Sequence, residues 1–264
     1  MKQEIEVSPE LKRRLRAVSR VLGSKREFMA RFMKHYIFDR CQVQADRVLA
    51  SQNEFMSAMK FCLRTRQRTV NSDLRNGLRK MRKLYPRIKQ SVHDGDDINE
   101  LGKDVYSPVG TQRHVRGVGQ KVGSLILEVL IHYGQANPEL EEQLYVPIDT
   151  HVFRVLTDCL GVKAPPNVKG ATYNAARFQA LQKLLKESAA TGVPRICFDY
   201  LWFVGKVFCT EAGKEHAVTE EKHPKKRYPR TFRLCSLCWI RRHCIYEPRW
   251  DVPSRSARAR PEAS

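Results

Sequence analysis

Apolar residues recur along this chain mostly with the three- and four-residue spacing of α-helices. One such stripe spans 11–22 and another spans 178–185; their members are Leu11, Leu15, Val18 and Leu22, and Phe178, Leu181, Leu184 and Leu185. This spacing places the apolar side chains on one face of a helix. Nothing in the pattern resembles a set of alternating strands, so the chain is predicted to be all-α.

Glycine, proline and asparagine divide these stripes into many short helices. Such residues cluster at 94–96, 137–138, 164–167 and 192–194, and they favour turns. Two further segments lack the apolar residues needed to build a core. Residues 210–233 form a polar, strongly basic insert, and 247–264 form a tail rich in Pro, Ser and Arg that we expect to be disordered.

The net charge points to a polyanionic partner. Lys and Arg number 48 against 28 Asp and Glu among 264 residues, which gives a formal charge of +20. An excess of this size favours nucleic acid, although a basic surface can also serve solubility or face an acidic membrane.

The chain contains no apolar run near the ~18–20 residues of a membrane span. Residues 1–9 include Glu4 and Glu6 and lack the apolar centre of a secretory signal. We therefore expect an intracellular monomer in a reducing compartment, with no membrane partner. That compartment would be the cytoplasm or nucleoid of a prokaryote, or the nucleus or mitochondrion of a eukaryote.

Four cysteines form a candidate metal site. Cys235, Cys238 and Cys244 have the spacing C-x2-C-x5-C, and Cys209 lies upstream. Four thiolates suit either a [4Fe–4S] cluster or a structural zinc. A zinc ribbon usually has two C-x2-C knuckles, and this chain has one. The other cysteines lie in apolar stretches and are predicted to be buried as small hydrophobic residues: Cys41, Cys62, Cys159 and Cys197.

A glycine turn at 117–121 precedes the apolar stripe of another predicted helix, which begins at Val122. Two glycines before a helix N-terminus allow the backbone to approach a phosphate, whose charge is met by free N–H groups. Together with a preceding helix, this turn would form a hairpin that binds a DNA backbone. The alternative is a glycine helix boundary that binds nothing.

Lys121 and Asp149 are the candidate catalytic residues. Lys121 falls in the first turn of its predicted helix, where the helix dipole disfavours a cation and so favours an uncharged, nucleophilic amine. The alternative is an ordinary surface lysine. Asp149 precedes a predicted helix over 152–160, where it can cap the helix. It can also accept a proton or stabilise a developing sugar cation, and the two roles are compatible.

Taken in order, these motifs resemble the helix-hairpin-helix (HhH-GPD) DNA glycosylases of the endonuclease III type. Residues 117–121 are similar to the family's Gly-Val-Gly-x-Lys hairpin, and 148–155 to its Val-Asp-Thr-His-hydrophobic-x-Arg-Val run. The cysteines at 235–244 match the last three ligands of its [4Fe–4S] loop, and 205–209 match the helix end that carries the first. Residues 62–66 are more weakly similar to a Leu-Ser-x-Arg/Gln-Thr segment.

The resemblance implies a two-lobe HhH-GPD fold. A central helical lobe over 50–135 would carry the hairpin. Residues 1–49 and 136–246 would form the second lobe with the cysteine loop. Duplex DNA with a damaged base or an abasic site would bind between the lobes, with the target base flipped out of the stack.

The resemblance also implies a bifunctional DNA glycosylase and abasic-site lyase. Lys121 would attack the sugar C1′ with the help of Asp149, and β-elimination from the resulting Schiff base would nick the strand. Cys209, Cys235, Cys238 and Cys244 would hold a structural [4Fe–4S] cluster, with zinc as the alternative. The residues implied to contact DNA are Arg64, Gly117, Gly119, Gln120, His151 and Arg154.

Three departures from the family pattern keep other functions open. Between Cys209 and Cys235 lie 25 residues, 135–145 has the character of an insertion, and the stretch between Arg66 and Gly117 is short. One alternative is a glycosylase without lyase activity that acts on mismatched or alkylated bases, although Lys121 argues against it. Another is a non-catalytic nucleic-acid-binding protein with a four-cysteine metal site. The sequence does not specify which base is removed.

Overall fold

A computed structural model describes residues 5, 7–64, 71–96, 120–134, 137–163, 175–210 and 237–245. Throughout these ranges the regular structure is helical and contains no strand, so the all-α prediction is confirmed. The described part contains no helix that is long and apolar enough to cross a membrane.

The N-terminal helices follow the predicted apolar stripe. Helix α1 spans Pro9–Gly23, and α2 spans Arg26–Met33 and continues as the π-helix η1 over Lys34–Asp39. Ser8 begins α1 by accepting a hydrogen bond from the N–H of Leu11 at 3.1 Å, and Pro9 provides a backbone already set for the first turn. The predicted stripe over 11–22 is buried.

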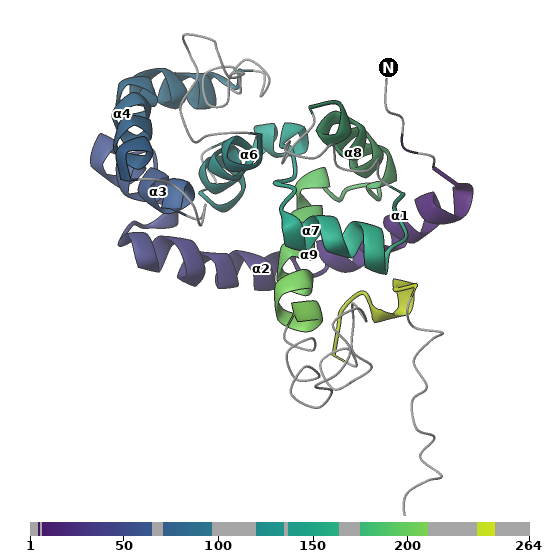
Figure 1. The fold of residues 1–264 in the computed structure, drawn as a ribbon. Coiled ribbons are helices and arrows are strands. Elements are labelled where there is room, and N and C mark those ends of the chain that lie inside the picture. Colours follow the sequence, from purple (N-terminus) through teal and green to yellow (C-terminus); the bar gives the residue numbers. More distant parts are fainter. Residues whose placement is uncertain are drawn as a thin grey trace, which may run out of the picture.

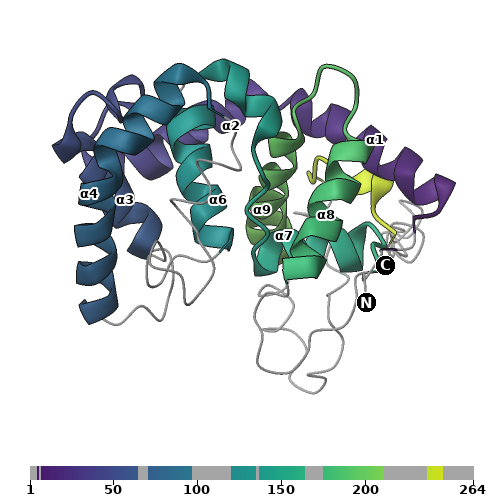
Figure 2. The same cartoon turned by 90° about the horizontal axis from the view of Figure 1, so that it is seen from above.

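Helices α3 (Gln52–Arg64) and α4 (Asn71–Asp94) pack side by side after the short 3-10 helix η2 (Ala45–Arg47) (Figures 1 and 2). The rings of Phe55 and Tyr85 lie 5.2 Å apart, and the Tyr85 hydroxyl donates to the Leu49 carbonyl at 3.1 Å. Helix α4 contains Pro86 and ends just before Gly95, whose φ of 75° suits glycine. The breaker predicted at 94–96 is therefore confirmed.

The remaining helices surround the predicted site motifs. Helix α6 spans Gln120–Glu128 and continues as η3 (Val129–Tyr133), and α7 spans Thr150–Arg154 and continues as η5 (Val155–Cys159). Figures 1 and 2 both show α6 between α4 and α7. The C-terminal elements are α8 (Ala175–Ser188), η6 (Arg195–Tyr200), α9 (Leu201–Phe203), η7 (Val204–Thr210) and η8 (Arg241–His243).

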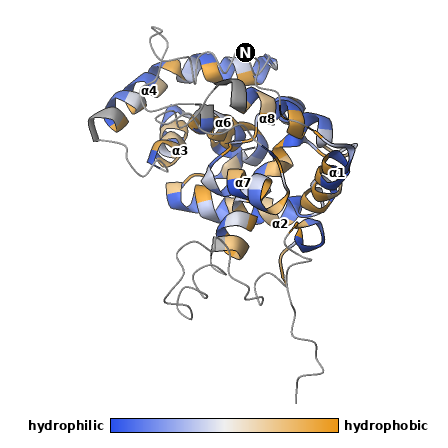
Figure 3. Cartoon of the chain, turned by 45° about the vertical axis from the view of Figure 1, so that its right-hand side comes forward, coloured by the Kyte–Doolittle hydropathy of each residue, from blue (hydrophilic) through white to orange (hydrophobic). Residues whose placement is uncertain are grey.

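Hydrophilic and hydrophobic residues both occur along the outer helices, as Figure 3 shows for α1 and α4. Their apolar positions pack into one continuous core that also receives α6, α8 and η6. Burial of that apolar surface is the main term that holds these short helices in place.

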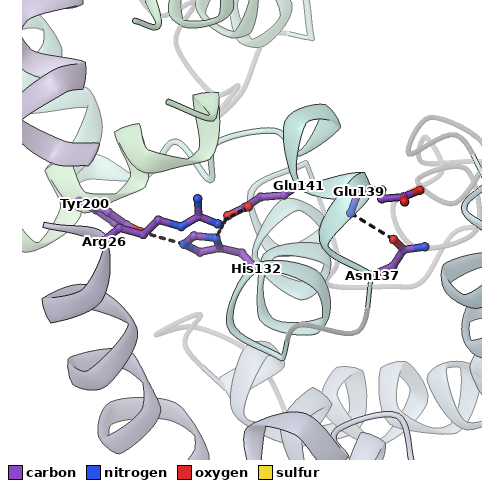
Figure 4. Close-up of polar contacts among 6 residues, drawn as sticks. All are labelled: Arg26, His132, Asn137, Glu139, Glu141 and Tyr200. Carbon is purple, nitrogen blue, oxygen red and sulfur yellow. Dashed lines mark hydrogen bonds and ion pairs between the residues drawn. The ribbon is translucent and has the colours of Figure 1, made fainter. Parts of the chain in front are cut away.

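Residues 137–145 are the described part of the segment 135–145, which the sequence suggests to be an insertion, and a buried polar network holds them (Figure 4). They contain the short 3-10 helix η4 (Pro138–Gln143), and the Asn137 side chain caps it by accepting a hydrogen bond from the N–H of Glu139 at 3.2 Å. Glu141 accepts hydrogen bonds from Arg26 of α2 and from Nδ1 of His132, and His132 Nε2 lies 2.9 Å from the Tyr200 hydroxyl. These contacts join η4 to α2, η3 and η6.

The predicted burial of the four remaining cysteines is correct for three of them. Cys62, Cys159 and Cys197 are buried, whereas Cys41 is only partly buried. Cys41 comes just after η1, where the chain turns at Gln42 with a φ of 55°. Because the backbone leaves the helix there, one side of the Cys41 side chain stays near solvent.

Candidate functional site

Lys121 and Asp149, the two candidate catalytic residues, lie together although 27 residues separate them in sequence. Lys121 is the second residue of α6, as predicted, and its Nζ lies 3.9 Å from Oδ2 of Asp149. The Lys121 side chain is 38% exposed and that of Asp149 is 10% exposed. The pair therefore places a buried carboxylate behind an amine that solvent and ligands can reach.

Asp149 is the N-cap of α7, as predicted. Its Oδ1 accepts hydrogen bonds from the N–H groups of His151 at 2.7 Å and Val152 at 2.8 Å. These two bonds satisfy helix-end donors that would otherwise be unpaired. They also fix the carboxylate so that Oδ2 faces Lys121.

Three cationic side chains act on His151, which lies two positions after Asp149 in the sequence. Partial burial lowers the pKa of His151; the Asp149 charge opposes this, and Arg154, Lys206 and Lys121 lower the pKa further. His151 is therefore uncharged at neutral pH. Arg154 and Lys206 are exposed, so they can meet an anionic ligand at this surface.

Two buried acids lie in the interior next to the Lys121–Asp149 pair. Burial raises the pKa of Asp199 most, the negative charge of Asp149 adds to the effect, and the resulting pKa is about 7. Burial and the neighbouring Asp199 raise the pKa of Glu128 well above its ordinary value. The Glu128 carboxylate has no hydrogen bond of good geometry within the described part of the chain. Both acids thus hold protons at pH values where exposed carboxylates are ionised.

The described structure brings three thiols together at the end of the cysteine loop. The Sγ atoms of Cys159 and Cys209 are 4.0 Å apart, and Cys244 lies against the same Cys159 thiol. Hydrogen bonds with Cys209 and then Cys244, together with burial, raise the pKa of Cys159. The backbone N–H of Ile245 also donates to the Cys159 carbonyl at 2.7 Å, which fixes the end of the loop on η5.

Gly205 explains how Cys209 reaches this position. A Cβ atom at Gly205 would lie 2.9 Å from the carbonyl oxygen of His151, so any larger residue would push η7 away from α7. The close packing allows η7 to carry Cys209 to the end of η5.

Aromatic side chains attach the cysteine loop to the helices. Trp239, next to Cys238, stacks on Phe203 with ring centroids 5.0 Å apart and meets Phe28 edge-on at 5.3 Å. The ammonium group of Lys25 lies 5.7 Å from the centre of the Trp239 ring. The loop is therefore anchored on α2 and α9 by apolar contacts.

The four candidate cysteines could bind a metal centre through their thiolates, but only three of the four lie in the described residues. No group of three or more His, Cys, Asp and Glu side chains there has the arrangement of a metal site. Cys209, Cys238 and Cys244 are described, and Cys235 lies outside the described residues, as does most of the 210–233 insert. Sulfur donors from η7 and the loop nevertheless face one region, which fits a thiolate-bound centre in chemical type.

The other candidate residues are distributed around α6 and α7. His151 and Arg154 lie on α7, and exposed Arg64 is the last residue of α3. Gln120 begins α6, while Gly117 and Gly119 lie outside the described residues. The predicted helix after the glycine turn is confirmed, and the conformation of the turn stays a prediction.

Two features of this region were not predicted. Cys159 was expected to be a buried core residue but not to contact Cys209, and no role was expected for Glu128 or Asp199. Fifty positions separate Cys159 from Cys209, so no local spacing links them. A cysteine in the helix that follows Asp149 was the available signal.

Comparisons with protein-family models, curated protein sequences and solved structures found no match to this chain.

Proposed function

We propose that this protein is a DNA glycosylase with abasic-site lyase activity that acts on duplex DNA with a damaged base. The observation that carries the proposal is the 3.9 Å approach of Lys121 Nζ to Asp149 Oδ2 at a positively charged surface. A lysine amine whose proton a neighbouring carboxylate can accept is suited to covalent catalysis. The resemblance of the surrounding motifs to HhH-GPD glycosylases supports the same assignment.

In this mechanism the uncharged Lys121 amine attacks C1′ of the target nucleotide. A bond forms between Nζ and C1′ while the glycosidic bond breaks, and the bonding electrons leave with the base. Asp149 Oδ2 stabilises the positive charge that develops on the sugar and receives the proton released by the amine. Because hydrogen bonds hold Oδ1, the carboxylate keeps its orientation during these steps.

The strand is then nicked by elimination. The N–C1′ adduct first becomes a Schiff base: the C1′–O4′ bond breaks, its electrons and a proton go to O4′, and a C1′=N bond forms with Lys121. The Schiff base makes a C2′ proton acidic, and removal of that proton by a base expels the 3′ phosphate with the electrons of the C3′–O bond. Hydrolysis of the Schiff base regenerates the amine. None of these steps requires electron transfer.

The proposal includes the two-lobe HhH-GPD fold, with a central lobe over 50–135 and a second lobe formed by 1–49 and 136–246. Gly117 and Gly119 would present backbone N–H groups to a phosphate, and Arg64, Gln120, His151 and Arg154 would contact DNA. The formal charge of +20 agrees with such a partner.

A metal centre held by Cys209, Cys235, Cys238 and Cys244 completes the proposal. A [4Fe–4S] cluster would act as a structural element that fixes the loop between 235 and 244, and zinc in the same thiolate set is the alternative. Trp239, in the middle of this loop, packs on Phe203 of α9, and Ile245, just after the loop, is hydrogen-bonded to Cys159 of η5.

The deciding experiment is strand cleavage of a duplex that carries one abasic site, followed by a panel of duplexes with one lesion each. We expect cleavage at the abasic site and base release from at least one lesion. A folded protein that binds the abasic duplex without cleaving it would identify a non-catalytic binding protein. Base release without cleavage would identify a glycosylase that lacks lyase activity.

A further inference from the structure

An open groove lies between α3 and α4, and the charged residues that line it are all basic among those that the structure describes. It has a volume of about 540 Å³ and is lined by Lys60, Arg75, Arg79 and Arg82, with Asn53 and Ser57 as neutral polar neighbours. No described acidic residue lines it. The groove therefore presents hydrogen-bond donors and positive charge to the same ligand.

Within the described part of the chain, no acidic side chain neutralises the cations of this groove. Lys60, Arg75 and Arg82 form no ion pair within the described ranges, and Arg79 donates only to the neutral Asn76 side chain, at 3.0 Å. Glu54, an acidic residue of α3, is paired with Arg47 at 3.3 Å. The positive potential of the groove is thus available to a partner.

The spacing of the arginines fits a nucleic-acid strand. Arg75, Arg79 and Arg82 lie at positions i, i+4 and i+7 on one face of α4. At ~1.5 Å rise per residue, this row is about 10.5 Å long. A nucleic-acid strand carries one phosphate per nucleotide, so the three arginines of this row can each meet one phosphate of the same strand. Guanidinium groups bind phosphate oxygens through two parallel hydrogen bonds.

The walls of the groove are fixed before any ligand binds. The Gln52 side chain donates to the Arg82 carbonyl at 3.0 Å, which ties the start of α3 to α4. The packing of Phe55 on Tyr85 and the hydrogen bond from Tyr85 to Leu49 hold the same end. A rigid groove loses little conformational freedom on binding, which favours affinity.

The groove is separate from the Lys121–Asp149 pair. Both Figure 1 and Figure 2 place α6, which carries Lys121, between α4 and α7, which Asp149 caps. A ligand in the groove therefore contacts the molecule on the other side of α6 from Asp149.

We propose that the α3–α4 groove is a second nucleic-acid site, which binds about three successive backbone phosphates of a DNA duplex whatever its sequence. The site has no part in catalysis, and its function is to increase the area of DNA that the protein holds. This inference stands on the charges and spacing of the groove and does not depend on the proposed glycosylase activity.

The test compares two triple variants of α4 that remove equal charge. One is Arg75→Gln/Arg79→Gln/Arg82→Gln. The control is Lys80→Gln/Lys83→Gln/Arg87→Gln, whose exposed residues share a different face by their spacing. Fluorescence anisotropy with an undamaged duplex of about 30 base pairs would measure affinity over a range of salt concentrations.

We expect the groove variant to weaken binding at least about tenfold and to reduce the slope of log affinity against log salt by about 2–3, since each neutralised phosphate contributes about 0.9. The control should change the slope by less than about one. Equal effects of the two variants would show that binding depends on overall charge, and this would overturn the proposal. A groove variant with wild-type affinity and salt slope would also overturn it. Circular dichroism would confirm that both fold.

A separate readout keeps this result distinct from the proposed function. At low salt and saturating protein, the groove variant should still cleave an abasic-site duplex at the wild-type rate. If the wild-type protein fails to cleave, the proposed function is wrong while the groove result stands. If the groove variant binds normally but loses cleavage, the groove belongs to the catalytic site and the inference is wrong.

Discussion

Asp149 divides its two carboxylate oxygens between its own helix and Lys121. Oδ1 accepts two backbone hydrogen bonds at the start of α7, and Oδ2 lies 3.9 Å from Lys121 Nζ. A helix cap and a catalytic carboxylate are therefore the same group here. A substitution that keeps the capping oxygen but removes the carboxylate charge can separate the capping role from the catalytic role.

Replacing Lys121 by Ala should abolish covalent trapping. Borohydride added during reaction of the wild-type protein with an abasic-site duplex should reduce the Schiff base and leave a protein–DNA adduct. Lys121→Ala removes the amine and should give no adduct, measured as a shifted band on a denaturing gel. Lys206→Ala, an exposed lysine near the same site, is the control and should still form it. An undiminished adduct in Lys121→Ala would place the nucleophile elsewhere.

Asp149→Asn should slow base release while leaving the protein folded. Asparagine caps helices about as well as aspartate, so α7 should keep its N-terminus, whereas Asp149→Ala should cost an additional ~1 kcal/mol of stability. Loss of the carboxylate charge should reduce single-turnover base release by about 10²–10⁴-fold. Trapping on a preformed abasic site should fall less, because no base remains to be expelled. A wild-type rate of base release in Asp149→Asn would remove Asp149 from the mechanism.

The cysteine set should hold a metal centre. Protein purified without oxygen should be brown and contain about four iron and four sulfide per chain. Cys244→Ser should lose the metal and destabilise the C-terminal region, since metal binding is coupled to folding. Cys197→Ser, a buried cysteine of the core, should keep it. Colourless protein with about one zinc per chain would show that the site holds zinc and not an iron–sulfur cluster. Metal-free wild-type protein that is fully folded would rule out both.

The network around Glu141 should make stability sensitive to acid. Burial raises the pKa of Glu141, but the hydrogen bond from His132 and the charge of Arg26 outweigh it, so the pKa is lowered below 4.5. A lowered pKa means that the stabilisation is present above pH 4.5 and is lost as the pH falls through the folded-state value. At neutral pH, Glu141→Gln should therefore reduce the free energy of unfolding by about 1–3 kcal/mol.

Urea unfolding of Glu141→Gln and wild-type protein over pH 3–7 would check this. The two curves should converge at the acidic end. Glu142→Gln is the control, because Glu142 is exposed and adjacent, and its curve should follow the wild type. A constant difference between Glu141→Gln and wild type at every pH would contradict the prediction.

Asp199 should give the opposite pH dependence. Burial and the charge of Asp149 raise its pKa from 3.8 to about 7. A raised pKa means that its contribution to stability is fully present below pH 3.8 and is lost as the pH rises through about 7. Asp199→Asn cannot ionise, so at about pH 8 it should unfold at least 2–4 °C above the wild type, which corresponds to ~1 kcal/mol. Thermal melts at several pH values would measure this, with the exposed Asp94→Asn as control. A melting temperature of Asp199→Asn that falls with pH as steeply as the wild type's would contradict it.

Local patterns predicted the helical class and four of the helices. The apolar stripes over 11–22 and 178–185 are buried faces of α1 and α8, and the predicted helices after Gly119 and Asp149 are α6 and α7. Such predictions succeed because helix periodicity and N-capping depend on residues within a few positions of one another. The role of Asp149 as a cap was predictable for the same reason.

Contacts between distant segments were set by tertiary packing alone. The sequence showed four clustered or helix-end cysteines but not that Cys159 joins Cys209 and Cys244, because this requires η7 to pack closely on α7 at Gly205. It suggested an insertion at 135–145 but not the pairing of Glu141 with Arg26 and His132. Burial, which raises the pKa values of Glu128 and Asp199, likewise depends on which helices surround them.

The sequence by itself therefore determined the helical class, the helices that follow Gly119 and Asp149, and the candidate residues Lys121 and Asp149. Only the tertiary structure decided that Lys121 and Asp149 lie 3.9 Å apart and that four cations of α3 and α4 line one groove. The physical reason is the distance along the chain over which each effect acts. Periodicity and capping act over one or two helical turns, whereas electrostatic and packing partners are chosen when the whole apolar core closes and brings remote helices together.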